Sequence, residues 1–232
     1  MKKYLTWAKL VLLLTLYGCS AEKRNDVNPV RTMISEFETG TENWIGDYAL
    51  YNRKDTTEIA FLMEKDSLPA AIDSLKFSVR MEATNLGDSI FLFMKKKIVG
   101  LNPEKTYHVS FDINIGTNYP DLPNATGTKI SLKAGASSTE PVKILNAGYY
   151  NVSIKKGLWN VDGSEMVILG NVTNGIGRAT YQLVNRNSAD KTITVKPDAN
   201  GTIWVCVGED TRYNEGKTVL YFDSIKVELT EQ

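Results

Sequence analysis

Apolar and polar residues alternate with a period of two along several stretches of the chain. In the segment 107–115 every odd-numbered residue is apolar and every even-numbered residue is polar, and the segment 74–81 follows the same rule. This period predicts half-buried β-strands, because successive side chains of a strand point to opposite faces of its sheet. The segment 89–94 (SIFLFM) is apolar on both faces, which favours a central strand covered by a second layer.

Many other short runs have a β-type composition and are separated by Gly, Pro, Asn and Asp. They predict further strands at 33–37, 44–51, 58–63, 129–133, 149–154, 166–169, 180–184, 192–195, 203–207 and 219–229. No stretch has a convincing helical period. About a dozen antiparallel strands without long helices predict an all-β fold, a two-sheet antiparallel β-sandwich of the jelly-roll type that forms one domain over residues 31–232.

The first 30 residues differ in pattern from the rest of the chain. Two lysines at positions 2 and 3 precede an apolar run at 10–16 and the pair Gly18-Cys19, which is typical of an export signal. The run is too short to span a bilayer. The alternative interpretation is a buried strand at 10–16, but the basic start and the abrupt polar switch at Ser20 favour processing.

The residues LYGC at 16–19 resemble the cleavage box of bacterial lipoproteins, although Tyr17 is larger than the residue usual at its position. The resemblance implies a signal peptide at 1–18, a lipid on Cys19 and a polar, lipid-anchored tether at 19–30. It also implies an outer-membrane lipoprotein that faces either the periplasm or the cell exterior. Its contact with the membrane would then be through the N-terminal lipid only.

The net charge argues against one class of partner, and the cysteine content predicts the state of Cys206. Removing residues 1–18 takes away three lysines and leaves 24 basic and 27 acidic residues, so the mature net charge is about −3. Such a chain has no basic excess to hold a phosphate backbone, which argues against a nucleic-acid partner. If Cys19 carries lipid, Cys206 has no partner within the chain, and its apolar surroundings (GTIWVCVG) predict a buried, inert thiol.

Catalytic motifs are not found in the sequence. The single histidine, His108, excludes an H-E-x-x-H zinc site, and neither a G-x-S-x-G elbow nor a phosphate-binding loop is present. His108 and Asp112 share one strand face but lie about 13 Å apart in a regular strand, which is too far for a hydrogen bond. The sequence therefore predicts that the chain is not an enzyme, with a glycoside-active enzyme as the third alternative because two suitably spaced carboxylates could occur among the many acids.

Aromatic residues outside the core period are the candidates for ligand binding. Rings of this kind stack on the apolar C–H faces of sugars, while neighbouring polar groups bond to the hydroxyls. The candidates are Trp44, Tyr119, Trp159 and Tyr213, together with His108 and Asp112 on the polar face of the strand at 107–115. Alternatives remain open for the tryptophans: Trp44 could cap the core and Trp159 could pin its loop.

Three stretches resemble one known family. EFETGTENW at 36–44, GLNPEKTYHVSFDI at 100–113 and VLYFDSIKVEL at 219–229 are similar to segments of the galactose-binding-like jelly rolls, which include many carbohydrate-binding modules. The chain is also similar to surface lipoproteins of Bacteroidetes-type bacteria. The resemblance implies a non-catalytic binding module at the cell envelope with a carbohydrate ligand. The alternative is a structural or protein-interaction subunit of an envelope complex, with an envelope protein as its partner.

The resemblance also implies one structural calcium ion. In calcium-containing members of the family, an acid of the first segment and an Asp of the last strand help to hold it; here these are Glu38 and Asp223, with the carbonyls of Gly40 and Thr41 as further ligands. Asp223 has the same parity as the apolar residues that follow it, which predicts an inward carboxylate in need of a partner. A hydrogen-bonded Asp at a strand end is the alternative.

Overall fold

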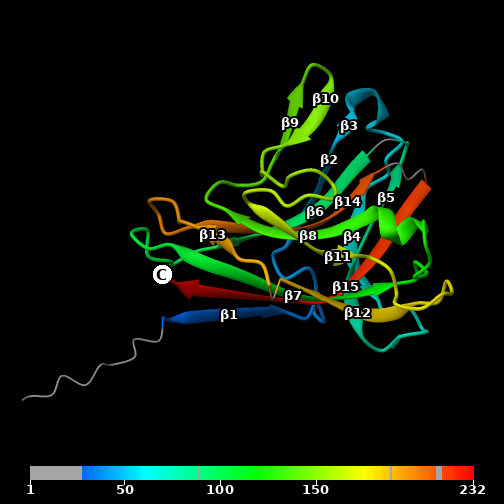
Figure 1. Cartoon of the computed structure of the whole chain (residues 1–232), viewed down its shortest axis with the longest axis horizontal. Coiled ribbons are helices and arrows are strands. Elements are labelled where there is room, and N and C mark those ends of the chain that lie inside the picture. Colours follow the sequence, from blue (N-terminus) through cyan, green and yellow to red (C-terminus); the bar gives the residue numbers. More distant parts are fainter. Residues whose placement is uncertain (1–27, 88, 189, 213–215) are drawn as a thin grey trace, which may run out of the picture.

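A computed structural model describes residues 28–87, 89–188, 190–212 and 216–232 of the chain. These residues form two β-sheets packed face to face and a third, small sheet that projects from one end (Figure 1). Within the described residues, no helix is long and apolar enough to cross a membrane. The segment 1–18, Cys19, most of the tether at 19–30 and Tyr213 lie outside the described residues, so the predictions made for them stay predictions.

The bounds of the strands are as follows. Within the described residues the first sheet contains β12 (Gln182–Asn187), β7 (Tyr107–Thr117), β15 (Gly216–Glu231), β5 (Phe77–Asn85) and β4 (Leu62–Ser67) in this order, with β1 (Val30–Ser35) paired to β15 and β13 (Ile193–Val195) paired to β7. The second contains β11 (Met166–Asn171), β8 (Ile130–Ser137), β14 (Ile203–Arg212), β6 (Ser89–Ile98) and β2 (Ile45–Ala49). The third contains β3 (Tyr51–Asn52), β10 (Tyr149–Val152) and β9 (Lys143–Asn146). Two short 3-10 helices, η1 (Arg53–Asp55) and η2 (Thr126–Lys129), complete the elements.

The chain passes back and forth between the two large sheets. Strands β5 and β7 belong to the first sheet, and β6 and β8 to the second, while β14 and β15 cross in the same way at the C-terminal end. All described strand pairs are antiparallel. This alternation confirms the predicted all-β sandwich of the jelly-roll type.

The core lies between the two large sheets and follows the predicted alternation where one face is wet. On β7, the odd-numbered residues from 107 to 115 are all buried, and His108 and Asp112 are exposed on the opposite face. The prediction was wrong at Leu75, which is 88% exposed, because it lies in the turn before β5 begins at Phe77. Cys206 is fully buried in a smaller cluster with Phe91 and Phe93 on the other side of the second sheet, and burial raises the pKa of its thiol far above the usual value.

Candidate functional site

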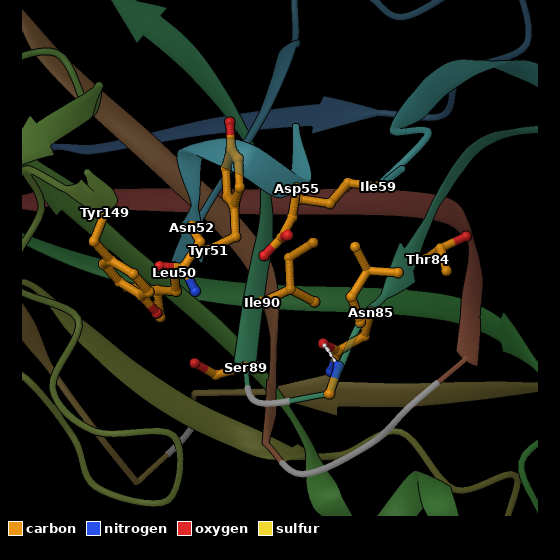
Figure 2. Close-up of a pocket in the computed structure, with 12 residues that line it drawn as sticks. Leu50, Tyr51, Asn52, Asp55, Ile59, Thr84, Asn85, Ser89, Ile90 and Tyr149 are labelled. Atoms are coloured by element: carbon orange, nitrogen blue, oxygen red, sulfur yellow. Dashed lines mark hydrogen bonds between the residues drawn. The ribbon is translucent and has the colours of Figure 1, made fainter. Parts of the chain in front are cut away.

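Two pockets open side by side at the end of the sandwich where β5 passes into β6 and β14 ends; Figure 2 shows the first of them. The first has a volume of about 290 Å³ and the second of about 620 Å³. Leu50, Ser89 and Tyr149 line both pockets. The two are therefore adjacent, and we call them together the end cleft; all three sheets contribute to it.

The first pocket of the end cleft has a buried amide on its wall. Asn85, at the end of β5, is 3% exposed, and its Oδ1 accepts a hydrogen bond from the backbone N–H of Gly87 at 3.3 Å (Figure 2). Its Nδ2 has no hydrogen-bond partner among the described residues. A buried donor without an acceptor costs about 1–3 kcal/mol, so this group favours a ligand or solvent oxygen beside it.

The second pocket is bounded by aromatic and aliphatic side chains. Trp159 and Tyr149, both half-buried, line it together with Leu50 and Leu158, of which Leu158 is 67% exposed. Trp159 and Leu158 come from the loop 155–165, whereas Tyr149 comes from β10. Two rings from separate elements thus face one open pocket, which suits the flat apolar face of a sugar ring or another aromatic group.

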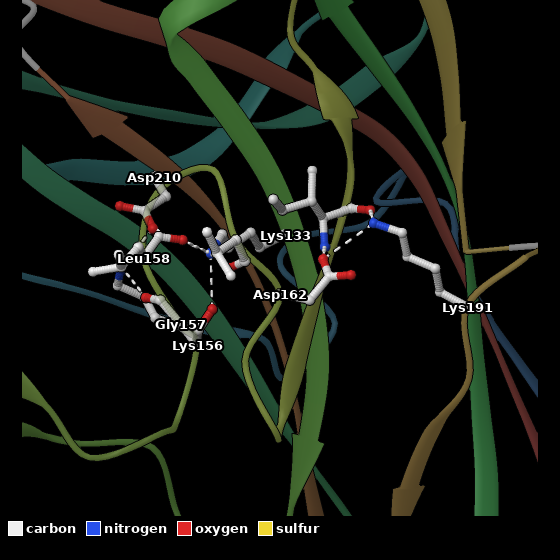
Figure 3. Close-up of polar contacts among 9 residues, drawn as sticks. Lys133, Lys156, Gly157, Leu158, Asp162, Lys191 and Asp210 are labelled. Carbon is white, nitrogen blue, oxygen red and sulfur yellow. Dashed lines mark hydrogen bonds and ion pairs between the residues drawn. The ribbon is translucent and has the colours of Figure 1, made fainter.

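Two residues that line the second pocket, Lys156 and Asp210, belong to a cluster of buried charges with Lys133 (Figure 3). The carboxylate of Asp210 is 1% exposed; its Oδ2 accepts a hydrogen bond from Lys156 Nζ and lies 3.5 Å from Lys133 Nζ. Its Oδ1 has no hydrogen-bond partner among the described residues. Burial lowers the pKa of the Lys133 ammonium group to about 8, although the charge of Asp210 raises it. Arg212, two residues further along β14, also lines this pocket.

The structure places one predicted binding residue, Trp159, in the end cleft. Trp44 is 3% exposed in the core, where its Nε1 donates a hydrogen bond to Ser35 Oγ at 3.0 Å, so its ring is not available to a ligand and the binding role predicted for it is corrected. Tyr119 is half-buried, and its hydroxyl oxygen accepts a hydrogen bond from the Val219 backbone N–H at 3.3 Å. Burial raises its pKa well above the usual value, which fits a packing role.

His108 and Asp112 lie elsewhere, on the outer face of the first sheet. Asn185 Nδ2 donates hydrogen bonds to Asp112 Oδ1 at 2.5 Å and to Asn114 Oδ1 at 3.0 Å, and Asn114 Nδ2 donates to Ser224 Oγ at 3.0 Å. The result is a polar ladder across β12, β7 and β15. The His108 face is therefore a wet, hydrogen-bonded sheet surface and not part of the end cleft.

The residues predicted to hold calcium are partly brought together. The backbone N–H of Phe77 donates to Glu38 Oε2 at 3.4 Å, and the Thr41 carbonyl accepts a hydrogen bond from the Trp44 N–H at 2.9 Å. A β-bulge at Asp223 interrupts the strand parity, so its carboxylate is half-buried and not directed fully inward as predicted.

Burial raises the pKa of the Asp223 carboxyl, and the negative charges of Glu38 and Glu36 raise it further, whereas Lys76 lowers it. Among the described residues, no three His, Cys, Asp or Glu side chains are grouped closely enough to hold a metal ion. Two carboxylates and the carbonyls of Gly40 and Thr41 would have to supply most of the oxygens. Calcium binding stays a prediction.

Asn85 and Asp210 of the end cleft, and Lys133 behind it, were not predicted from the sequence. Lys133 offered one signal, because a lysine inside the small and apolar run ISLKAGAS is exceptional in a strand that is buried along its whole length. Asp210 offered a similar one at the end of the apolar β14. No sequence signal marks Asn85. Its amide lies beside a pocket only because strands from three sheets meet there.

No known protein family matches the sequence, and no curated protein matches it either. Among solved structures, the chain is similar to one of the carbohydrate-binding modules of the β-sandwich superfamily, with 11% identity over 85% of this chain and a TM-score of 0.37, and it spans 60% of that structure's length. A carbohydrate-binding module that recognises mannan shares 10% identity over 86% of this chain and 98% of its own, with a TM-score of 0.39.

The enzymatically active domain of a tailspike protein from bacteriophage CBA120 shares 11% identity over 82% of this chain and 20% of its own, with a TM-score of 0.35. Carbohydrate-binding modules and an enzyme domain thus occur among the structural neighbours. With TM-scores below 0.5, these likenesses carry no argument about function.

Proposed function

We propose that the chain is a non-catalytic carbohydrate-binding module that holds a glycan in the end cleft. The observation that carries the proposal is the combination, in one cleft, of the Trp159 and Tyr149 rings with two buried polar atoms that lack partners among the described residues, Asn85 Nδ2 and Asp210 Oδ1. A sugar hydroxyl both donates and accepts hydrogen bonds, so it suits an unpaired amide donor and an unpaired carboxylate acceptor. The rings would stack on the apolar face of the same ligand.

The charges of the end cleft support binding without catalysis. Glycoside hydrolysis commonly uses a pair of carboxyl groups on either side of the scissile bond, one as the general acid and the other as the nucleophile or the base that activates water. The carboxylates that line the described cleft are Asp55 and Asp210, and Asp210 is ion-paired to Lys156 and Lys133. Both ammonium groups contact the same oxygen, Oδ2, so this oxygen is already engaged within the protein.

We further propose that a lipid on Cys19 anchors the module at the cell envelope. The motif at 16–19 and the polar segment that follows it support this. Metabolic labelling with a radioactive fatty acid is expected to label the wild-type protein and not Cys19→Ala. Equal labelling of the two proteins would contradict the lipid anchor and leave the ligand proposal untouched.

The ligand proposal is tested on a glycan array that covers plant, host and bacterial polysaccharides, with the full-length protein in detergent. We expect binding to at least one class of glycan and a loss of at least tenfold in affinity for Trp159→Ala. Trp204→Ala is the matched control, because Trp204 is also half-buried but does not line the end cleft. A negative array, or equal losses in both variants, would count against the proposal.

A second candidate function is docking to another envelope protein. The strand β9 is an edge of the small third sheet and carries Ile144 and Leu145, which are 46% and 44% exposed, and Val142 just before it is 39% exposed. Exposed apolar side chains on an edge strand are typical of protein contacts. This function predicts a partner that co-purifies with the wild-type protein and is lost in Ile144→Asp, with no response to sugars.

A further inference from the structure

The loop 155–165 carries Trp159 into the end cleft, and it contains neither helix nor strand. It is nevertheless tied down at both ends. The carboxylate of Glu165 accepts hydrogen bonds from the Lys155 N–H at 2.7 Å and from Ser137 Oγ at 2.9 Å, and Asp162 Oδ1 accepts one from Lys191 Nζ at 3.1 Å. These contacts hold the loop at residues 155, 162 and 165, and the Val161 N–H donates to the Leu158 carbonyl at 3.1 Å in the turn that contains Trp159.

The middle of the loop is held by Lys133. This residue lies in β8 and is fully buried, and its Nζ donates hydrogen bonds to the carbonyl oxygens of Lys156 at 2.8 Å, of Leu158, and of Val161 at 3.0 Å (Figure 3). An ammonium group has three N–H donors, and the loop supplies one carbonyl for each. The loop backbone thus folds around a side-chain cation as it would around a bound ion.

The surrounding charges keep the ammonium group in this position. Asp210 Oδ2 lies 3.5 Å from Lys133 Nζ and also accepts the hydrogen bond from Lys156 Nζ. The buried cluster therefore contains two ammonium groups and one carboxylate, with Asp162 as the next acid that affects Lys133. The excess positive charge is compensated by carbonyl dipoles of the loop. Removing Lys133 would leave the Leu158 carbonyl with the Val161 N–H at 3.1 Å and would take from the Lys156 and Val161 carbonyls the donor that Lys133 gives them.

We propose that Lys133 is a positioning residue that fixes the loop 155–165 in its binding conformation, so that Trp159 lies against the end cleft before a ligand arrives. This inference deepens the proposed function and rests on it for the role of Trp159. A preformed loop spares the ordering entropy that a mobile loop loses on binding. The three hydrogen bonds from Lys133 to the loop carbonyls, which we call the clamp, need no ligand and can be tested without one.

The first test is hydrogen exchange of the full-length protein, followed by mass spectrometry, for Lys133→Met. Methionine keeps the length of the side chain but has no donors. We expect exchange in peptides that cover 155–165 to rise at least tenfold, while β7 and β14 exchange at the wild-type rate. Lys191→Met is the matched control, because Lys191 also contacts this loop but is 40% exposed, and it is expected to change exchange less than threefold. Unchanged exchange of the loop in Lys133→Met would overturn the proposal.

A second variant keeps the proposal testable if Lys133→Met does not fold. Gly157 has a φ of +74°, and a Cβ there would lie 2.5 Å from the Val161 carbonyl oxygen, so Gly157→Ala should displace the carbonyls while Lys133 remains. We expect acetylation of Lys133 by acetic anhydride, read by mass spectrometry, to rise at least tenfold in this variant. Unchanged acetylation would contradict the clamp. The two proposals can fail separately. If the loop loosens in Lys133→Met or Gly157→Ala but Trp159→Ala binds glycans as the wild type does, the clamp is supported and the proposed ligand site is overturned.

Discussion

Glu209 of β14 and Thr218 of β15 connect the two large sheets through a buried hydrogen bond. The Thr218 hydroxyl donates to Glu209 Oε1 at 2.8 Å, and both side chains are fully buried. The other carboxyl oxygen of Glu209 has no hydrogen-bond partner among the described residues. Burial raises the pKa of this carboxyl from its ordinary 4.5 to about 7, although the bond from Thr218 lowers it.

This pair predicts a pH-dependent stability. Between pH 4.5 and about 7, Glu209 holds a proton in the folded state and not in the unfolded state, so the free energy of unfolding falls as the pH rises through this window. Glu209→Gln keeps an acceptor for Thr218 and carries no charge. At pH 8 it is expected to be more stable than the wild type by about 1–3 kcal/mol, and at pH 4 nearly equal to it.

Urea unfolding at several pH values measures the effect of Glu209. Glu104→Gln is the control, because Glu104 is exposed and should leave the pH profile unchanged. If Glu209→Gln shows the same dependence on pH as the wild type between 4.5 and 7, the assignment to Glu209 is wrong.

Trp44 is expected to act in stability and not in binding. Trp44→Phe removes the hydrogen bond to Ser35 Oγ and leaves Ser35 with the Lys96 ammonium donor at 3.1 Å. Losing a buried hydrogen bond and part of a ring should lower the free energy of unfolding by about 1–3 kcal/mol. Chemical denaturation of Trp44→Phe, Ser35→Ala and the double variant measures this. If the loss of unfolding free energy in the double variant equals the sum of the losses in the two single variants, the two side chains do not interact.

Two adjacent tyrosines offer a matched test of the end cleft. Tyr149 lines both pockets, whereas Tyr150 packs beside Tyr51, with ring centroids 5.0 Å apart, and near the Lys143 ammonium group. Neighbouring residues of a strand point to opposite faces. We expect Tyr149→Ala to lower affinity for an array-positive glycan by about tenfold, since a stacked ring contributes on the order of 1 kcal/mol or more. Tyr150→Ala should bind the glycan as tightly as the wild type does. If Tyr150→Ala loses affinity and Tyr149→Ala does not, the glycan binds elsewhere.

The sequence predicted the fold best where one face of a strand is wet. On β7 the alternation specified both the strand and its buried residues, because period two is unambiguous there. In β8 all eight residues are buried, so no alternation distinguishes Lys133 from its neighbours in orientation. The strand β9 was not predicted because its apolar residues, Ile144 and Leu145, are adjacent and exposed and so give no period of two.

The candidate site was harder to predict than the fold, because it depends on which loops meet. Trp159 was identified as an aromatic residue in a polar loop, and the structure places it in the end cleft. Trp44 has the same aromatic character and also follows a turn, and only its three-dimensional neighbours reveal the bond to Ser35. Asn85 and Asp210 come from different sheets and are 125 positions apart in the sequence. The hydrophobic period and the composition of the chain do not indicate that two such distant residues line neighbouring pockets.

Calcium is the last prediction, and it concerns the acids around Asp223. Glu38 and Glu36 raise the pKa of Asp223 beyond the effect of burial, so a bound cation would relieve their mutual repulsion. We expect 1 mM calcium to raise the midpoint of thermal unfolding and a chelator to lower it, since a ligand that binds only the folded state at 100 times its Kd adds about 2.7 kcal/mol. Asp223→Asn should abolish the response, whereas Asp112→Asn on the outer face of β7 should retain it. A midpoint that is the same with calcium and with chelator would remove the ion and leave Asp223 as a half-buried acid at a β-bulge.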